Sequence, residues 1–517
     1  MTKLISLMLA AGEDSDAQAA MVSGEQRLGP GEVRRSVGRA IAALESGGVT
    51  AGQRLVAIPT HDPNAVFLLA AASAIGAQIV MPYNLRQGAL TELAKIVSWA
   101  RPHHVVDLRG DRVLLEGLRA LGVNVLELRA RALADASPLK SDIIVRSPEP
   151  VADFLVFFTS GTTGRPKAIS IPESLICRRI VRVSERLKFD GAARIFMSGL
   201  MNNTTGIIFS FGALLHQATL VFPGGRDVES WPTQVQASAA THLMLRPASM
   251  KRFIHGARQT SSDLSSLRVV AYGAAALPRQ VLEEGRALMP CEWVQGYGLS
   301  ETFGPFCWLT EEDHRAGRYQ EHVYCVGRPD DTMEVMIDRT GGGTGDVGEI
   351  VLRGAASMMR GYYDDSLSTV IPPGECFRTG DLGRLTSDGY LVLKGRRSHT
   401  LLSADGHQIY PEEVESVLAG IPGVDDAVLL SLPGANDLGS SPVACIQGEI
   451  ATRGDAEIRE LVTEALAAHL GREKWPDYVF ASRLPFPTNG NDKIIKEEVA
   501  KLLPQGALIA IAPGTGQ

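Results

Sequence analysis

Short apolar runs alternate with longer helix patterns along much of this chain. Between Arg54 and Asp107, the strand-like runs LVAI, QIVM and HVVD are separated by helix patterns at Asn64–Ile75 and Leu90–Trp99. Strands buried on both faces of a parallel sheet are apolar throughout, and the next parallel strand is reached through a helix. The alternation continues from FLVFF at 154–158 to LRVVAYG at 267–273. The sequence therefore predicts parallel α/β layers over the first half of the chain.

The pattern changes after Thr332. Three β runs, MEVMI, EIVLRG and YLVLKG, are separated by Gly-rich or Asp-Gly turns, which is typical of an antiparallel or barrel-like part. One turn, Gly343–Gly348, spells G-x-G-x-x-G, but it lies between two β runs and not before a helix, so we interpret it as a hairpin loop. From about residue 400 a smaller α+β segment follows, with helix patterns and β runs at Pro411–Leu418, Asp426–Leu432, Ala456–His469 and Tyr478–Phe480.

The composition argues against several classes of protein. A net charge of -7 is unlike the basic balance of a nucleic-acid binder. The six cysteines include no C-x-x-C pair and the histidines show no metal spacing, so we expect neither a disulfide scaffold nor a zinc site. No apolar run reaches the ~18 residues that span a bilayer. The run LISLMLAAG after Lys3 is short and acids follow it, so we expect an ordinary first helix and a cytoplasmic protein.

The most informative motif follows the apolar run FLVFF directly. Glycines let the backbone approach a ligand, and free N–H groups, hydroxyls and a lysine ammonium are donors for a phosphate. The spacing differs from the nucleotide-binding pattern G-x-x-x-x-G-K-[ST]. An isolated loop of this composition is equally well a flexible surface turn, but the full pattern favours phosphate binding. Its residues are Thr159, Ser160, Gly161, Thr162, Thr163, Gly164, Arg165, Pro166 and Lys167.

This loop resembles the signature of the AMP-forming adenylating superfamily, which includes acyl-CoA synthetases, luciferases, adenylation domains and stand-alone acyl-amide ligases. Further motifs are similar to those of the same superfamily and follow its order over nearly the whole chain. They include candidates for the adenine and magnesium motif, the ribose motif, the hinge entry and the catalytic-lysine segment. These motifs are Gly273–Pro278, Tyr297–Thr302, Val326–Pro329, Thr379–Gly383, Gly395–Arg396 and Pro485–Lys496.

The resemblance implies an α/β fold with two domains of unequal size. A large N-terminal adenylating domain over residues 1–395 would bind ATP and the acid, and it would contain the parallel α/β layers and the barrel-like part. Residues 396–399 would form the hinge. A small, mobile α+β domain over residues 400–517 would carry the catalytic lysine.

The resemblance also implies a reaction. A carboxylate is a poor electrophile because its leaving group would be oxide, whereas its attack on the α-phosphate of ATP gives an acyl adenylate and releases pyrophosphate. Negative charge gathers around the α-phosphate in the transition state, so the site needs cations and donors there. By resemblance, Lys493 supplies a mobile cation, Glu301 binds Mg²⁺ and Thr302 touches the α-phosphate. The structural alternatives are a solvated surface lysine for Lys493 and a helix N-terminal carboxylate for Glu301.

The nucleotide itself would be held by groups from several motifs. By resemblance, Tyr297 stacks on adenine, with a core tyrosine as the alternative. Asp381 accepts both ribose hydroxyls, with an ordinary turn aspartate as the alternative. The Gly-rich loop holds the departing pyrophosphate. The predicted ATP-binding residues are Thr159, Ser160, Gly161, Thr162, Thr163, Gly164, Lys167, Gly273, Tyr297, Asp381 and Arg396.

The chain departs from the family pattern near the predicted acyl pocket. Acyl-CoA synthetases often carry an aromatic residue and a gating histidine where this chain has Met201–Gly206, and Asn203 stands at the histidine position. Amides there either bind an oxygen of the substrate or cap the following helix, and both interpretations stay open. We expect a medium-sized apolar or cyclic acid with a polar feature. The predicted pocket residues are Asn202, Asn203, Gly206, Phe209, Ala274 and Gly296.

The hinge departs from the pattern as well. Ser398 and His399 stand where the family usually has an Asp or Lys pivot, and the loop to Gly406 is one residue longer. The pivot lets the small domain rotate between the adenylating and transfer states. The departures favour an amine acceptor such as an amino acid, as in amide ligases similar to coronafacate ligase. The alternative acceptor is coenzyme A.

The predicted partners are therefore small molecules: a carboxylic acid, ATP with Mg²⁺, and an amine or coenzyme A. We expect no nucleic-acid partner, and both a monomer and a homodimer fit the sequence. A degenerate binding protein is the remaining alternative. Because Lys493, Glu301 and Asp381 are all retained, we favour an enzyme.

Overall fold

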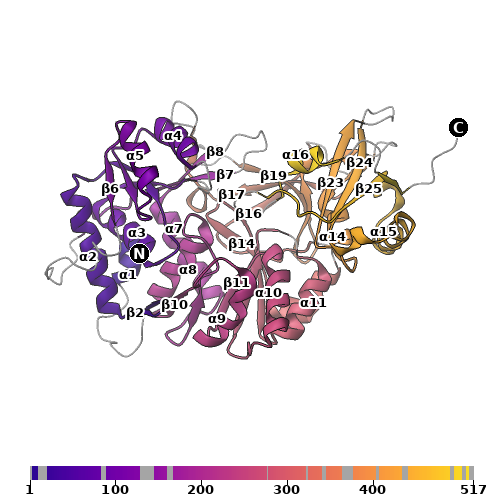
Figure 1. The fold of residues 1–517 in the computed structure, drawn as a ribbon, viewed down its shortest axis with the longest axis horizontal. Coiled ribbons are helices and arrows are strands. Elements are labelled where there is room, and N and C mark those ends of the chain that lie inside the picture. Colours follow the sequence, from indigo (N-terminus) through magenta and orange to yellow (C-terminus); the bar gives the residue numbers. More distant parts are fainter. Residues whose placement is uncertain are drawn as a thin grey trace.

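The computed structural model contains two large mixed sheets, a four-stranded antiparallel sheet, a two-stranded ribbon and a further four-stranded sheet. Figure 1 shows the C-terminal helices and strands, in orange and yellow, gathered at one end of the molecule. The structure describes residues 3–9, 20–82, 89–128, 145–159, 167–275, 277–321, 324–340, 345–363, 376–402, 407–433, 440–488, 494–503 and 508–511.

The nine-stranded sheet has the order β15-β14-β13-β12-β11-β9-β10-β1-β2. Its central strands from β13 to β1 are parallel, and antiparallel strands extend both edges. Its strands are β1 (Met21–Ser23), β2 (Gln26–Leu28), β9 (Arg194–Phe196), β10 (Thr219–Phe222), β11 (His242–Leu245), β12 (Val269–Gly273), β13 (Glu292–Leu299), β14 (Gly304–Leu309) and β15 (Arg328–Pro329). The helices along this part of the chain are α7 (Glu173–Arg186), α8 (Thr204–Leu215), η1 (Val228–Ser230), α9 (Trp231–Ser238), α10 (Pro247–Thr260), α11 (Arg279–Leu288), α12 (Glu311–Arg315) and α13 (Arg318–Glu321).

The seven-stranded sheet has the order β18-β8-β7-β4-β3-β5-β6. Five strands are parallel, and β8 and β18 are added antiparallel at one edge. The strands are β3 (Arg54–Ile58), β4 (Gln78–Val80), β5 (His104–Asp107), β6 (Val125–Glu127), β7 (Leu155–Thr159), β8 (Lys167–Ile171) and β18 (Gly361–Tyr363). The helices of this part are α1 (Leu4–Leu9), α2 (Pro30–Ser46), α3 (Pro63–Ile75), α4 (Ala89–Ala100) and α5 (Arg112–Ala120). Parallel α/β layers are therefore confirmed.

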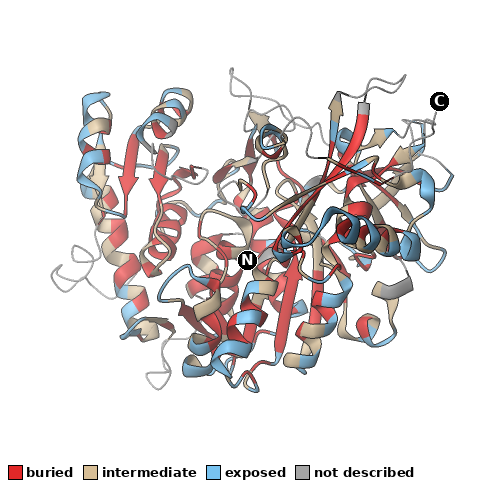
Figure 2. Ribbon diagram, turned by 45° about the vertical axis from the view of Figure 1, so that its right-hand side comes forward, coloured by how far each residue is buried: buried red, intermediate tan, exposed pale blue. Residues whose placement is uncertain are grey.

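Helix α3 lies at the centre of the largest hydrophobic core. Every residue of α3 except Asn64 is buried, as expected for a helix that is apolar on all sides. Asp62 caps its start by accepting a hydrogen bond from the Asn64 N–H at 2.8 Å, and Gly76 ends it with φ of 88°. The predicted first helix, α1, packs on α3, α7 and α8. Figure 2 shows buried strands behind helices with exposed outer faces.

The antiparallel part is the sheet β16-β17-β19-β20. Strands β16 and β17 are antiparallel neighbours, so the G-x-G-x-x-G stretch does connect a hairpin, although residues 341–344 lie outside the described ranges. This arrangement agrees with the change of pattern after Thr332. The elements are β16 (Glu334–Asp338), β17 (Gly348–Arg353), η2 (Ala355–Ser357), β19 (Phe377–Leu385) and β20 (Leu391–Arg396).

The C-terminal part is an α+β unit with a hydrophobic core of its own. Its central strand β24 pairs with β23 antiparallel and with β25 parallel, and β24 was not among the predicted β runs. The elements are η3 (Arg397–His399), β21 (Leu401–Leu402), β22 (Gln408–Ile409), α14 (Pro411–Ala419), β23 (Asp426–Pro433), β24 (Ser440–Gln447), η4 (Glu449–Thr452), α15 (Asp455–His469), η5 (Arg472–Lys474), β25 (Tyr478–Ser482), α16 (Lys496–Lys501) and β26 (Ile509–Ala510). Within the described ranges, every helix is too short or too polar to cross a bilayer.

Two buried histidines predict that acid destabilises the fold. His242 in β11 and His314 in α12 are almost fully buried, and burial lowers the pKa of each from 6.5 to about 4. Between these values the unfolded chain binds protons that the folded chain excludes. This contribution to stability is therefore complete above pH 6.5 and is lost as the pH falls toward 4. We expect each histidine to lower the free energy of unfolding by up to about 1.4 kcal/mol per pH unit in this range.

Urea unfolding at about pH 5 and about pH 7 measures this effect. The variants His242→Gln and His314→Gln should each show a smaller difference between the two pH values than the parent chain. A difference unchanged in both variants would mean that other groups cause the acid sensitivity.

Candidate active site

Three residues from distant parts of the sequence meet at one point of the structure. The Tyr297 hydroxyl, from β13, donates to Asp381 Oδ2 at 2.7 Å, and Arg396 Nε, from β20, lies 2.7 Å from Asp381 Oδ1. Asp381 is buried and lies within strand β19, so the interpretation of T-G-D-L as an ordinary turn is wrong. The structure thus brings together three of the predicted ATP-binding residues.

This cluster can still accept further hydrogen bonds. Burial raises the pKa of Asp381, while Arg396 and the Tyr297 hydroxyl favour its charged form. Burial and the Asp381 carboxylate raise the pKa of Tyr297, so its phenol keeps its proton and acts as a donor. An ionised carboxylate has about four acceptor positions, and two are used here. The remaining positions suit a pair of ligand hydroxyls.

Two glycines lie side by side in the neighbouring strands β12 and β13, Gly273 as the last residue of β12 and Gly296 within β13. Gly273 pairs with Gly296, and a Cβ atom at Gly273 would lie only 2.3 Å from the Gly296 carbonyl oxygen. The next residue, Ala274, is exposed and has φ of 68°. In α/β sheets, ligands bind outside the carboxyl ends of the strands. The predicted residues Gly273, Ala274 and Gly296 therefore lie at a suitable edge for a ligand.

Glu301 lies in the turn between β13 and β14, so the helix N-terminal alternative is wrong. Its Oε1 accepts a hydrogen bond from the Tyr362 hydroxyl at 2.8 Å. No hydrogen bond or ion pair joins its Oε2 to another residue in the described part of the chain. The same described residues hold no group of three or more His, Cys, Asp or Glu side chains that could bind a metal. A magnesium ion here would depend on Glu301 and on oxygens brought by a ligand.

The same turn contains two hydroxyls with different surroundings. Thr302 is fully buried, and its hydroxyl bonds to the backbone of Leu299 and Gly304 at 2.7–3.0 Å. Ser300 is half-buried, and its hydroxyl bonds to no other residue in the described ranges. Thr302 therefore shapes the turn, and its environment gives no support to the predicted phosphate contact. Ser300, which is not among the predicted site residues, has the available hydroxyl.

The Gly-rich loop connects two paired strands. Thr159 at the end of β7 pairs with Lys167 at the start of β8, and both strands belong to the seven-stranded sheet. The ammonium of Lys167 lies 5.2 Å from the centre of the Tyr362 ring. The predicted residues between the strands, Ser160, Gly161, Thr162, Thr163 and Gly164, lie outside the described residues.

Four residues of the predicted acyl pocket, Asn202, Asn203, Gly206 and Phe209, lie just before α8 or in its first half. Asn203 caps this helix by accepting a hydrogen bond from the Gly206 N–H at 3.1 Å, while its Nδ2 is buried with no partner among the described residues. Gly206 packs so closely that a Cβ atom would lie 2.2 Å from the Leu200 carbonyl oxygen. Phe209 is buried against Phe189, with ring centres 5.5 Å apart. Asn203 thus acts as a cap and also keeps a free donor, and Asn202 beside it is half-buried.

The predicted hinge residues follow β20 directly. Ser398 and His399 lie in the 3-10 turn η3 and are exposed. His399 Nδ1 lies 3.5 Å from Glu412 Oε1 at the start of α14. Gly395 has φ of 152°, and a Cβ atom there would lie 2.3 Å from Glu412 Oε2. The chain therefore passes from β20 into the C-terminal part through a position that requires glycine.

A second connection joins the C-terminal part to α10. Lys251 Nζ donates to the carbonyl oxygens of Ala419, Val424 and Asp425 at 3.4, 3.1 and 3.0 Å. Burial lowers the pKa of Lys251. Because α14 ends at Ala419, the Ala419 carbonyl has no partner within the helix, and the Val424 and Asp425 carbonyls lie just before β23. Lys251 thus joins α10 to the end of α14 and to the start of β23.

The predicted catalytic lysine, Lys493, lies outside the described residues. The residues on either side of its segment are described: Thr488 and Ile494 form an antiparallel bridge, and the Ile495 N–H donates to the Pro487 carbonyl at 2.8 Å. The segment therefore starts and ends at one place on the C-terminal part.

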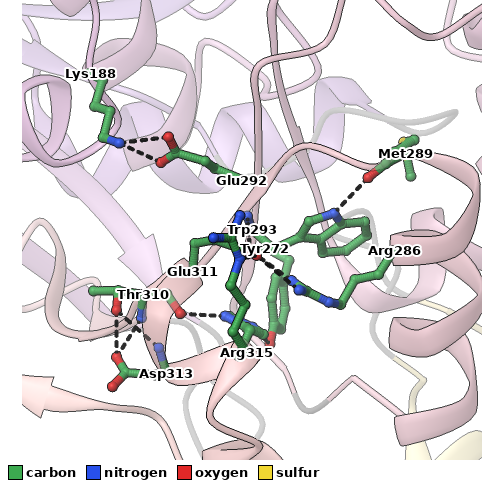
Figure 3. Close-up of polar contacts among 11 residues, drawn as sticks. Lys188, Tyr272, Arg286, Met289, Glu292, Trp293, Thr310, Glu311, Asp313 and Arg315 are labelled. Carbon is green, nitrogen blue, oxygen red and sulfur yellow. Dashed lines mark hydrogen bonds and ion pairs between the residues drawn. The ribbon is translucent and has the colours of Figure 1, made fainter.

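Ion pairs around the start of β13 fix the strand that carries Tyr297. The Glu311 carboxylate accepts hydrogen bonds from Arg286 at 2.8 and 2.9 Å and from the Trp293 backbone N–H at 2.9 Å. The Trp293 indole donates to the Met289 carbonyl at 3.1 Å (Figure 3). These bonds tie the start of β13 to α11 and α12.

Comparison with known proteins shows the family of this chain. A family model described as AMP-binding enzyme matches residues 10–363. The chain belongs to the AMP-binding enzyme family. This membership confirms the resemblance inferred from the motifs, and it confirms the predicted class of enzyme, an AMP-forming carboxylate ligase.

Relatives in this AMP-binding family match nearly the whole chain. Indoleacetate–CoA ligase from Aromatoleum aromaticum is 26% identical over 506 residues, covering 93% of this chain and 94% of the relative. The amide bond synthetase McbA from Marinactinospora thermotolerans shares the fold with a TM-score of 0.82 and 24% identity, covering 96% and 99% of the two chains. o-Succinylbenzoate coenzyme A synthetase from Bacillus subtilis, solved with ATP and a magnesium ion, has a TM-score of 0.78 and 20% identity, covering 96% and 99%. The predicted fold class is thereby confirmed.

Proposed function

We propose that this chain activates a carboxylic acid with ATP and Mg²⁺, forming an acyl adenylate and pyrophosphate, and then transfers the acyl group to an amine to form an amide. The observation that carries the first half-reaction is the contact of Tyr297 and Arg396 with the buried carboxylate of Asp381. These residues come from three motifs that lie far apart in the sequence. Their meeting supports a nucleotide site at this point.

In this proposal each group has a separate task. The open acceptor positions of Asp381 take the ribose hydroxyls, and Tyr297 lies against the adenine. The Gly-rich loop and Lys167 hold the departing pyrophosphate. The hydroxyl of Ser300 replaces Thr302 as the donor to the α-phosphate, since the Thr302 hydroxyl is already bonded within the turn. Lys493 brings a positive charge to the α-phosphate from the C-terminal domain, residues 400–517, which turns about the hinge at 396–399.

The residues of the turn after β13 fit a magnesium ion. Mg²⁺ is usually bound by one or two carboxylates together with phosphate oxygens, and Glu301 Oε2 is an oxygen without another partner in the described ranges. When bound, the ion would neutralise charge on the phosphates. The other oxygen, Oε1, accepts the hydrogen bond from the Tyr362 hydroxyl.

We propose an amine as the acceptor because this chain departs from the family pattern in the acyl pocket and at the hinge. Asn203 stands where acyl-CoA synthetases often have a gating histidine, and His399 contacts Glu412 where the family usually has an Asp or Lys pivot. Both differences weaken the case for a coenzyme A channel. Coenzyme A is the second candidate, and it is supported by the 26% identity to indoleacetate–CoA ligase over nearly the whole chain.

A panel of acids, each incubated with ATP and Mg²⁺ plus either coenzyme A or a mixture of amino acids, tests the acceptor. Mass spectrometry of the products should show amides in the amino-acid arm. Thioesters in the coenzyme A arm together with no amide in the other arm would contradict the amine acceptor and establish the second candidate.

The acid is proposed to be aromatic or cyclic and to carry a hydrogen-bond acceptor. The buried Nδ2 of Asn203 has no partner among the described residues, and a buried donor left unpaired is costly. An acceptor oxygen or nitrogen on the acid would pair with it. Indoleacetate, the aromatic acid for which the Aromatoleum aromaticum relative is named, supports the same class.

Replacing Asn203 with aspartate tests this contact. The variant keeps an oxygen that caps α8, so its stability should change little. It also exchanges the Nδ2 donor for an acceptor, and we expect the KM for the acid to rise about tenfold. Initial rates at saturating ATP measure this change, with Asn202→Asp as the neighbouring control. An unchanged KM for the acid would show that Asn203 is a helix cap only.

A further inference from the structure

Strand β18 joins the two loops that flank the proposed phosphate site. Residues 361–363 pair with β8, whose first residue is Lys167. Just before this strand, the Met359 N–H donates to the Glu301 carbonyl at 2.7 Å. The turn that carries Glu301 and the strand that carries Lys167 are therefore both bonded to one short segment.

Tyr362 makes a side-chain contact with each of the two loops. Its hydroxyl donates to Glu301 Oε1 at 2.8 Å, and the Lys167 ammonium lies 5.2 Å from the centre of its ring. Burial and the Glu301 carboxylate raise the pKa of Tyr362, so the phenol stays protonated and remains a donor. Tyr363, the next residue on β18, differs: its hydroxyl accepts a hydrogen bond from Gln78 at 3.4 Å and its ring packs on Trp99.

We propose that Tyr362 is a positioning residue that orients the Glu301 carboxylate for the magnesium ion of MgATP while its ring holds Lys167 beside the same phosphates. A single hydrogen bond to Oε1 fixes the rotation of the carboxylate and leaves Oε2 for the ion. Cation–π contact favours an ammonium over the ring face. Tyr362 thus fixes the spacing between the magnesium ligand and the pyrophosphate-binding lysine, an inference that rests on the proposed role of Glu301.

The expected loss of metal affinity follows from the role of Tyr362 as a positioning residue. Groups that orient a metal ligand without touching the metal typically contribute about 10- to 100-fold to metal affinity or activity. The variant Tyr362→Phe removes only the hydroxyl and keeps the ring over Lys167. It should therefore weaken the binding of the divalent cation and leave the metal-free binding of ATP nearly unchanged.

Binding of Mn²⁺ to the full chain, measured by electron paramagnetic resonance with α,β-methylene-ATP present, tests the inference. Four proteins are compared: the parent chain, Tyr362→Phe, Tyr363→Phe and Glu301→Gln. We expect the Mn²⁺ dissociation constant to rise about tenfold or more in Tyr362→Phe. In Tyr363→Phe, a matched loss of one hydroxyl on the same strand, it should stay at the parent value.

The comparison separates the inference from the proposed function. If Glu301→Gln loses Mn²⁺ affinity while Tyr362→Phe binds as tightly as the parent chain, the positioning role is wrong and the magnesium role of Glu301 stands. If Glu301→Gln also binds Mn²⁺ like the parent chain, both assignments are wrong. Equal losses in Tyr362→Phe and Tyr363→Phe would likewise contradict the inference, because the effect would then come from the strand.

Discussion

The variant Lys493→Ala should form acyl adenylate about 10²- to 10³-fold more slowly than the parent chain, with its fold intact. Loss of one preorganised group that stabilises transition-state charge costs about this much. Attack on the α-phosphate concentrates negative charge there, and the proposed function assigns the compensating cation to Lys493. Acid-dependent exchange of pyrophosphate into ATP measures this half-reaction alone.

The matched control for this variant is Lys501→Ala. Lys501 follows in the same C-terminal segment of the sequence, in α16, is exposed, and pairs with Glu498 on the surface at 2.6 Å. Surface pairs of this kind contribute about 0–1 kcal/mol, so exchange should continue at the parent rate. Exchange at the parent rate in Lys493→Ala itself would show that another group supplies the charge.

The variant Asp381→Ala should lower kcat/KM for ATP by about 10²- to 10³-fold. A hydrogen bond to a charged group contributes about 1.5–3 kcal/mol, and the Asp381 carboxylate would accept two of them from the ribose. Here Arg396 and the Tyr297 hydroxyl would both lose their acceptor, and the proposed ribose contacts would disappear. Steady-state rates at varied ATP concentration measure the loss.

Asp338→Ala is the control for this change. Asp338 lies in the same antiparallel sheet and pairs with Arg378 at 2.6 Å, outside the cluster around Tyr297. Its removal should leave the KM for ATP unchanged. If both variants alter the rate equally, Asp381 would be a structural residue of the sheet with no part in nucleotide binding.

Most of the architecture could be predicted from sequence because its strands and helices have strong local patterns. The run Val66–Met81 is mostly apolar and is interrupted by Gly76, and the structure has the buried helix α3 followed by β4 there. The pattern change after Thr332 marks the antiparallel sheet. Strand β24 escaped prediction because its segment SSPVACIQ contains a proline and a polar start.

The sequence predicts site residues only where they belong to a recognisable motif. The sequence placed Tyr297, Asp381 and Arg396 in one candidate nucleotide site, and the structure brings them into contact. It could not tell which hydroxyl of S-E-T is available, since the inward rotation of Thr302 follows from the turn that returns β13 to β14. Tyr362 was missed for a similar reason.

The contact between Tyr362 and Glu301 joins residues 61 positions apart in the sequence. No local pattern predicts such a contact, because it depends on how β18 is added to the edge of the seven-stranded sheet. The same holds for Lys251, whose carbonyl partners lie on the C-terminal part. Contacts of this kind require the tertiary structure.

The central claim is that this chain converts a carboxylic acid and ATP into an acyl adenylate. Exchange of labelled pyrophosphate into ATP, measured with a panel of aromatic and cyclic acids and with Mg²⁺, tests this claim most directly. We predict exchange that requires both the acid and the magnesium ion and that needs no acceptor. Acid-dependent turnover that releases ADP and phosphate, with no exchange for any acid of the panel, would contradict the account.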